Sequence, residues 1–156
     1  MIPGDDVRAV LRRFPFGVSV VTVDLEGERV GLTVASLVSL SLDPALVGIS
    51  IARQAALHEL LRGAAAFSVS LLAADQAPLA QHFARGVPPI AIWSGIELRS
   101  DGRAPLLAGA IGWLECDLEA EHAVADHTLF VGSVARAQQG RDAPPLLRLD
   151  GTYRGT

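Results

Sequence analysis

Residues 114–121 read Leu-Glu-Cys-Asp-Leu-Glu-Ala-Glu, a run in which apolar and acidic side chains alternate. Successive side chains of a β-strand point to opposite faces, so the run predicts a strand with one buried face and one face that carries all four acids. Sheets that are half buried in this way are commonly antiparallel. Cys116 falls on the apolar side of the run, where we expect it to be a small buried hydrophobe.

On either side of this run, short apolar segments alternate with turn signals. We expect strands at residues 18–23, from residue 30 onward, and at residues 38–42, 46–51, 67–71 and 127–134. Short helices are expected at residues 7–14, 55–61 and 75–83, the first capped by the carboxylate of Asp5 or Asp6 and the third by Asp75. Residues 86–89 are expected to form a loop and residues 100–102 a turn, and the chain ends in a tail with Pro and Gly.

The order of these elements favours a small antiparallel barrel. The strands follow one another without regular crossover helices, which argues against a parallel, doubly wound sheet, and closure would remove exposed edge strands. The length of 156 residues fits a single domain over residues 1–156. The expected fold is therefore mainly β, with two or three short helices.

Composition excludes several classes of protein. Half of the residues are hydrophobic and 19% are charged, which excludes a disordered chain, and the net charge of −4 argues against a nucleic-acid partner. We expect no membrane segment, because no run approaches about 20 apolar residues and the N-terminal residues lack a signal-peptide pattern. The single cysteine excludes an intramolecular disulfide and a multi-Cys metal site, and it favours a reducing cytoplasm.

Three short stretches carry residues that could do chemistry. Thr33 and Ser36 lie where the strand pattern lapses, and hydroxyls beside free backbone N–H groups can hold a polar ring or a phosphate. Asp126 could orient His127, and Arg53, at the end of a buried strand, could meet a phosphate. The nearby Ser39 and Ser41 have a plainer explanation, as the solvated face of an edge strand. The plainer alternative for Asp126 and His127 is a turn in which the two side chains make no contact, and for Arg53 it is an exposed arginine at a strand end. Motifs for a metal site, a nucleophilic serine or a nucleotide-binding Gly-rich loop are absent from the sequence.

Taken in order, these stretches resemble the flavin reductase-like, FMN-binding split-barrel family over nearly the whole chain. The resemblance rests on residues 17–22 (Gly-Val-Ser-Val-Val-Thr), 31–36 (Gly-Leu-Thr-Val-Ala-Ser), 39–44 (Ser-Leu-Ser-Leu-Asp-Pro), 67–72, 126–127, 132–134 and 151–153. It implies a homodimeric Greek-key split barrel that binds FMN or FAD near the subunit interface. It also implies NADH or NADPH as co-substrate and a separate monooxygenase that receives the reduced flavin.

The resemblance further implies roles for individual residues. His127 would lie at the nicotinamide site as the catalytic residue. The expected cofactor-binding residues are Thr33, Val34, Ala35 and Ser36 at the flavin ring and ribityl chain, Ser41, Leu42 and Asp43 along the isoalloxazine, Ser50, Ile51, Ala52 and Arg53 toward the phosphate, Phe83 and Arg85 closing over it, and Asp126 and Tyr153. The chain departs from the family pattern at Ala55-Ala56, where Ser or Thr is common, and at Ala125, where Gly is usual.

Two other functions fit the same fold. One is a flavin-binding or electron-transfer protein that does not use NAD(P)H, and the other is a dimeric barrel that has lost flavin. The leading hypothesis is an NAD(P)H-dependent flavin reductase, because hydride transfer between stacked rings depends on positioning and needs no protein nucleophile.

Overall fold

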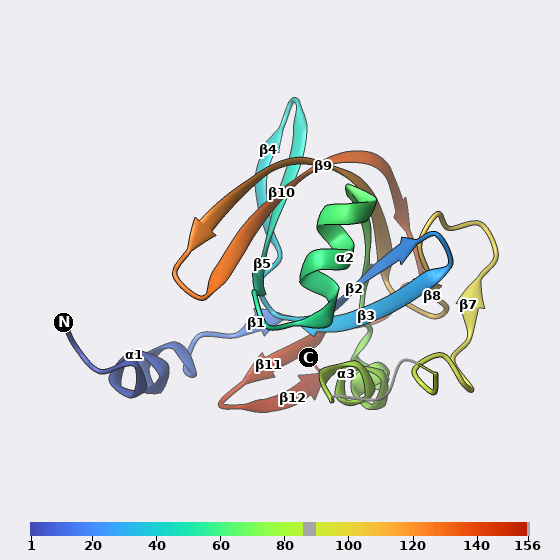
Figure 1. Ribbon diagram of the computed structural model, residues 1–156. Coiled ribbons are helices and arrows are strands. Elements are labelled where there is room, and N and C mark those ends of the chain that lie inside the picture. The colour runs from blue at the N-terminus through green and yellow to red at the C-terminus, as the bar shows by residue number, and fades with distance from the viewer. Residues whose placement is uncertain (86–89, 156) are drawn as a thin grey trace.

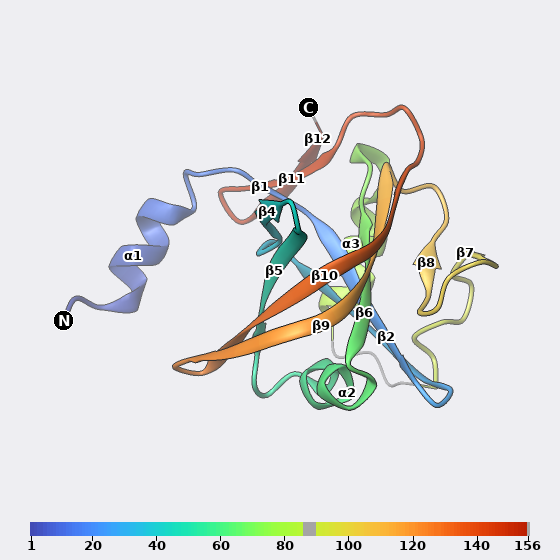
Figure 2. The ribbon, with the colours of Figure 1, turned by 90° about the horizontal axis from the view of Figure 1, so that it is seen from above.

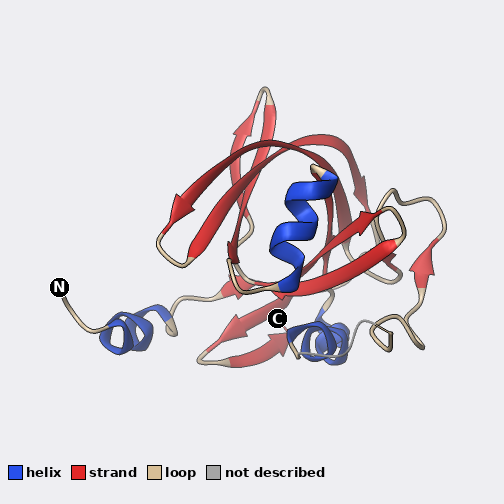
Figure 3. Ribbon diagram, in the orientation of Figure 1, coloured by secondary structure: helices blue, strands red, loops and turns tan. Residues whose placement is uncertain are grey.

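The computed structural model describes residues 1–85 and 90–155, so the loop expected at residues 86–89 lies outside the described residues. Antiparallel pairing dominates the structure, and the prediction of a mainly β fold with short helices is confirmed (Figures 1 and 3). The helices and strands have the following bounds: α1 Gly4–Leu11, β1 Phe16–Gly17, β2 Ser19–Leu25, β3 Glu28–Val34, β4 Val38–Leu42, β5 Ala45–Ala52, α2 Ala56–Ala64, β6 Ala66–Leu71, the 3-10 helix η1 Ala74–Gln76, α3 Ala77–Ala84, β7 Leu98–Arg99, β8 Leu106–Leu107, β9 Gly112–Val124, β10 His127–Gln139, β11 Leu146–Leu149 and β12 Thr152–Gly155.

The alternating run at residues 114–121 lies in β9, which forms a long hairpin with β10. This hairpin occupies the middle of a seven-stranded sheet with the order β3-β2-β6-β9-β10-β5-β4. Cys116 is fully buried, as expected. Glu115 differs from the other acids of the run: it is only 4% exposed, because Arg136 from β10 and the backbone N–H of Arg103 both bind its carboxylate.

Three residues, 35–37, link the opposite edges of the seven-stranded sheet, because β3 ends at Val34 and β4 begins at Val38. Four Cα–Cα steps reach at most about 15 Å, whereas seven flat strands would separate the two edges by about 29 Å. The sheet must therefore curl, and Figure 1 shows it bending around α2. Within residues 1–85 and 90–155 no pairing joins β3 to β4, so the ladder is open at this seam.

Helix α2 fills the concave face of the curled sheet. Its side chains Leu57 and Leu61 are buried with Phe67 of β6 and Phe130 of β10. The helix extends through Gly63, which the sequence pattern places at its end, and Ala65 takes the left-handed cap conformation instead. Burial of such large apolar side chains, at about 1.5–3 kcal/mol each, holds the helix in the sheet.

A smaller sheet with the order β1-β11-β12 packs with α3 below the main sheet. The residues expected to form an irregular C-terminal tail are thus the hairpin β11–β12. The capping role expected of Asp75 is wrong, since its carboxylate forms an ion pair with Arg141 and Gln76 binds the backbone N–H of Ala73. Sequence spacing could not predict these contacts, because Arg141 lies 66 residues after Asp75 and the partner of Gln76 is a backbone N–H.

Helix α1 stands apart from the rest of the chain, as Figure 2 shows. No residue of α1 is buried, and the apolar side chains Val7, Val10 and Leu11 are exposed. The expected carboxylate cap is also wrong: Pro3 occupies the capping position, and Asp5 pairs with Arg8. In the part of the chain that is described, no helix is both long and apolar enough to cross a membrane.

Candidate functional site

A cavity of about 230 Å³ lies where β3 ends. It is lined by Val18, Thr33, Val34, Ala35, Ala84, Arg148 and Tyr153. The structure therefore brings Tyr153, from the last strand, against three of the residues expected at the flavin ring. In the described part of the chain β3 pairs only with β2, so its other edge has no ladder partner there. Trp93 Nε1 donates to the carbonyl oxygen of Arg29 on that edge, and the outward-facing backbone groups nearer the end of β3 can bind the polar edge of a ligand.

The two hydroxyls that the sequence singles out have partners inside the protein. Thr33 Oγ1 donates to the carbonyl oxygen of Ala80 at 2.7 Å, which ties β3 to α3. Ser36 Oγ accepts from the backbone N–H of Ser50 and donates to its carbonyl oxygen, both at 3.1 Å. Both hydroxyl protons are therefore engaged, and what these groups still offer to a ligand is acceptor capacity.

The Ser36–Ser50 contact connects the cavity to the end of β5. Beyond Ser50, Ile51 turns its side chain into the core, so only its backbone is available to a ligand. Ala52 pairs with His127 across the sheet, and the backbone N–H of Arg53 donates to the carbonyl oxygen of Asp126 at 2.9 Å. Arg53, Asp126 and His127 therefore lie together at one end of β5 and β10.

His127 begins β10 directly after a tight turn. Its Nδ1 lies 2.8 Å from Oδ1 of Asp126, so the contact proposed for these neighbours is present. The hydrogen bond from His127 is the main reason that the pKa of Asp126 lies below its ordinary value. The carboxylate is thus ionised at neutral pH and fixes the orientation of a half-exposed imidazole.

Three expected site residues lie far from this group within one chain. Leu42 pairs with Ala45, five residues from Ser50, which places it about 17 Å away along β5. Ser41 and Asp43 flank it at the tip of the β4–β5 hairpin, which projects from the body in Figure 1. The side chain of Leu42 is 87% exposed.

Phe83 and Arg85 differ in their positions. Phe83 is 1% exposed and packs edge-on against His82 and on Trp93, beside Gly31. The expectation that its ring closes over the phosphate end is therefore wrong, because the ring is part of the core. Arg85 is exposed and follows Ala84, which lines the cavity.

Arg148 lines the cavity although the sequence pattern did not single it out. It lies on β11, and its guanidinium carbon sits 5.0 Å from the centre of the Tyr153 ring. The only available signal is an arginine inside the apolar run Leu146-Leu147-Arg148-Leu149, which precedes the family-like residues 151–153. Within the described residues, no group of three or more His, Cys, Asp or Glu side chains could hold a metal ion.

The model of the flavin reductase like domain family matches residues 11–156. The chain belongs to this family. Among the curated flavin reductases, the reductase component of 4-hydroxyphenylacetate 3-monooxygenase from Thermus thermophilus is 39% identical over 147 residues, which cover 94% of this chain and 93% of that protein. An NADH:FMN oxidoreductase from Rhodococcus erythropolis is 37% identical and covers 95% of this chain, with 79% of its own length matched.

Solved structures of flavin reductases agree with the fold. The NADH:FAD oxidoreductase of Streptomyces globisporus superposes with a TM-score of 0.91 at 36% identity, over 100% of this chain and 96% of that chain. A second structure of that reductase, in complex with NAD and FAD fragments, gives the same TM-score at 34% identity. The flavin reductase expected from the sequence is therefore confirmed at the level of family and fold.

Proposed function

We propose that this chain is an NAD(P)H-dependent flavin reductase that supplies reduced FMN or FAD to a separate monooxygenase. The observation that carries the proposal is the continuous line of predicted residues, from the β3 cavity through the Ser36–Ser50 contact to Arg53 and His127. Relatives named as NADH:FMN oxidoreductase and as a monooxygenase reductase component support the same activity. Their names also support the transfer of the reduced flavin to a second protein.

The residues of this chain would act by positioning the two ligands rather than by forming covalent bonds with them. The backbone at the end of β3, at Thr33, Val34 and Ala35, would bind the polar edge of the flavin ring, and Arg53 would bind its phosphate. His127, oriented by Asp126, would place the carboxamide of the nicotinamide. A bound flavin supplies the acceptor for the hydride, so the protein has to align two rings and exclude water rather than provide a nucleophile.

The experiment is oxidation of NADH and of NADPH by the purified protein with FMN or FAD added. We expect turnover well above a control that contains nucleotide and flavin without protein. Absence of turnover with all four pairs would contradict the reductase. Calorimetric titration with FMN and FAD separates the alternatives: tight binding without turnover would indicate a flavin-binding protein, and no binding would indicate a flavin-free barrel.

We propose that the site is completed by a second copy of the chain. The cavity of about 230 Å³ is smaller than the roughly 300–1,000 Å³ that small-molecule sites occupy. Ser41, Leu42 and Asp43 lie on an exposed hairpin tip, where they can reach only a ligand held outside their own chain. A homodimer would place this tip against the flavin of the other subunit, in a split barrel with paired sites.

Residues 1–156 are proposed to act as one domain in the cytoplasm. The family match over residues 11–156 supports a single domain. The single cysteine, which can form no disulfide within the chain, supports a reducing compartment. Burial raises the pKa of its thiol to about 12, which keeps Cys116 protonated and unreactive. A fractionation experiment that finds the chain outside the cytoplasm would contradict this assignment.

A further inference from the structure

Arg148 is a cation at the junction of two cavities. It lines the β3 cavity, and it also lines a groove of about 700 Å³ between α1 and the turn of the β11–β12 hairpin. Within residues 1–85 and 90–155, no carboxylate lies within ion-pair distance of its guanidinium. Arg148 thus adds an unneutralised positive charge to a site in a chain whose net charge is −4.

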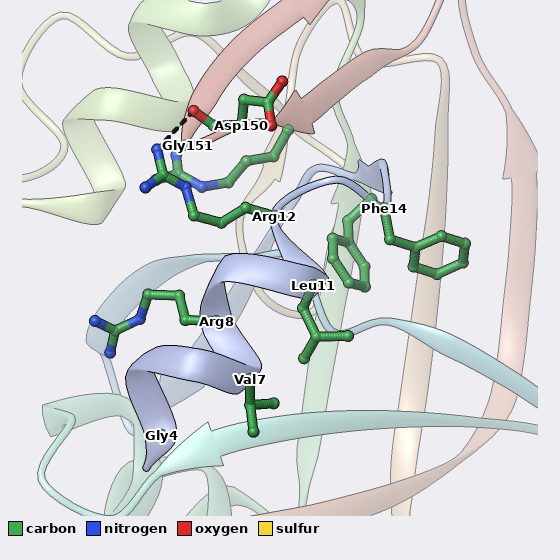
Figure 4. A pocket seen from close by; sticks show the side chains of 10 residues that line it. Gly4, Val7, Arg8, Leu11, Arg12, Phe14, Asp150 and Gly151 are labelled. Atoms are coloured by element: carbon green, nitrogen blue, oxygen red, sulfur yellow. Dashed lines mark hydrogen bonds between the residues drawn. The ribbon is translucent and has the colours of Figure 1, made fainter. Parts of the chain in front are cut away.

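The charged neighbours of Arg148 are engaged elsewhere. Arg8 is paired with Asp5, and the carboxylate of Asp150 lies 4.0 Å from Arg154. Arg12 donates to the carbonyl oxygen of Asp150 at 2.9 Å, a contact drawn in Figure 4. Asp150 is the one acidic residue among the described residues that line the groove, against Arg8, Arg12 and Arg148, so the groove lining carries a net positive charge.

The backbone holds Arg148 in a fixed position. It lies on β11, the central strand of the small sheet, where it pairs with Phe16 of β1 and with Tyr153 of β12. Its guanidinium lies over the Tyr153 ring, which orients the planar group without consuming its N–H donors. An arginine held in this way is suited to bidentate binding of phosphate oxygens.

We propose that Arg148 binds the diphosphate of a nucleotide whose redox-active ring occupies the β3 cavity. The inference rests on the proposed reductase activity, which supplies two such molecules, NAD(P)H and FAD. Either one would extend from the cavity past Arg148 into the groove, because Arg148 lines both. For FAD this path is an alternative to the phosphate contact with Arg53, whereas for NAD(P)H the two contacts hold different molecules. Arg148 is then a residue that discriminates dinucleotides from smaller ring compounds.

Binding of ADP tests the anion site without any need for turnover. Calorimetry would compare ADP and adenosine on the wild type, on Arg148→Gln, on Arg148→Lys and on Arg154→Gln. We expect ADP to bind more tightly than adenosine to the wild type. Loss of a charge-assisted contact should weaken ADP binding by about 10- to 100-fold in Arg148→Gln. Arg148→Lys should recover part of this loss, and Arg154→Gln should behave as the wild type.

Kinetics with a hydride donor and a hydride acceptor that both lack phosphate identify which molecule supplies the diphosphate. 1-Benzyl-1,4-dihydronicotinamide delivers hydride without any phosphate, and riboflavin accepts it without any phosphate. If the diphosphate belongs to NADH, Arg148→Gln should lower kcat/KM for NADH relative to the benzyl compound, with riboflavin as acceptor. If it belongs to FAD, the variant should lower kcat/KM for FAD relative to riboflavin, with the benzyl compound as donor.

The outcomes separate this inference from the proposed function. Turnover in the wild type, combined with equal ADP affinity in Arg148→Gln and Arg154→Gln, would overturn the diphosphate site and leave the reductase intact. Absence of turnover with every donor and acceptor would overturn the reductase. Equal losses for ADP and adenosine in Arg148→Gln, or a changed oligomeric state in that variant, would show that Arg148 is a structural residue and would also overturn the inference.

Discussion

His127 owes its orientation to its neighbour in sequence. The imidazole Nδ1 is 2.8 Å from the Asp126 carboxylate, so Nε2 is the ring nitrogen that this contact does not engage. The lowered pKa of Asp126 means that this partner stays ionised throughout the neutral range. A positioned imidazole of this kind can hold the carboxamide of a nicotinamide, whereas a freely rotating one would hold it poorly.

We therefore expect His127→Ala to affect the nicotinamide more than the flavin. The value of kcat/KM for NADH should fall about 10- to 100-fold, since one positioning hydrogen bond is lost. The Kd for flavin should change by less than about threefold. Steady-state kinetics and flavin titration measure the two effects. His122→Ala, an exposed histidine on the neighbouring strand β9, is the control and should change neither. Equal losses in both quantities would refute the role.

Ala125 carries backbone strain directly before this pair. Its φ of 51° lies in the left-handed region, where an L-residue with a Cβ is disfavoured and glycine is not. Ala65, which ends α2, has a φ of 53° and lies away from the candidate site. The two alanines therefore form a matched pair, with the same strain in different surroundings.

Substitution by glycine should stabilise the protein at both positions. We expect Ala125→Gly and Ala65→Gly each to raise the free energy of unfolding by about 1 kcal/mol, measured by denaturant titration. Only Ala125→Gly should also alter kcat/KM for NADH, because it loosens the turn that carries Asp126 and His127. A change in kinetics of the same size in Ala65→Gly would show that the effect is global.

Sequence patterns predicted the surroundings of individual residues less well than the positions of strands and helices. Thr33, Ala35 and Tyr153 lie together as the family resemblance implied, but Arg148 completes their cavity from a strand that resembled a tail. Period-two alternation assigned Glu115 to the solvent face, and it could not show that Arg136 of the next strand neutralises it. Partners distant in sequence decide burial at such positions, and local spacing carries no information about them.

Elements with strong local signals were predicted well. The strand expected at residues 38–42 has these bounds, because β-branched and apolar residues alternate with serine until Asp43-Pro44. The C-terminal hairpin was missed, since Pro144 and Pro145 precede it and a glycine lies at its turn. The hairpin is stabilised by the pairing of β11 with β1 and by the burial of Leu146, and both contacts form only in the folded chain.

The loop after β7 is held by ion pairs and should respond to acid. Asp101 accepts from Arg136 and from Arg99, both at 2.6 Å, and the hydrogen bond from Arg136 is the main reason that the pKa of Asp101 is lowered from 3.8. A lowered pKa in the folded state means that the stabilisation is complete above the unfolded value. It is lost only as the pH falls through the folded pKa.

We therefore expect Asp101→Asn to reduce stability at pH 7 and to flatten the loss of stability below about pH 4. Thermal unfolding between pH 2.5 and pH 7 measures both effects. Asp5→Asn removes a carboxylate from an exposed pair on α1 and is the control. If wild type and Asp101→Asn lose stability in parallel on acidification, the ion pairs do not hold the loop.

Most of the exposed large apolar side chains in the described residues gather in two places. Val7, Val10 and Leu11 face solvent on α1, and Leu40 and Leu42 face solvent on the β4–β5 hairpin. Groups of exposed apolar side chains on a small chain indicate a surface that another protein covers. The proposed covering protein is a second copy of the chain.

We expect the chain to be a dimer in solution and Leu42→Asp to be a monomer, as measured by sedimentation velocity. The monomer should bind flavin at least about tenfold more weakly, because the hairpin tip no longer reaches the other site. Val124→Asp places the same charge on an exposed residue of the β9–β10 turn, outside the proposed interface, and should remain dimeric. A Leu42→Asp dimer with unchanged flavin affinity would refute the shared site.

The position of the β9–β10 hairpin also governs how the chain can fold. Before residues 112–139 are available, the sheet exists as two separate pieces, β3-β2-β6 and β4-β5. Strands β6 and β5 then each present an unpaired edge, and Phe67 and Ile49 lack their partners from the hairpin. During synthesis, residues 1–139 of the 156 must therefore leave the ribosome before the core can close. These two strand edges are the surfaces on which a chaperone would act and from which aggregation would begin.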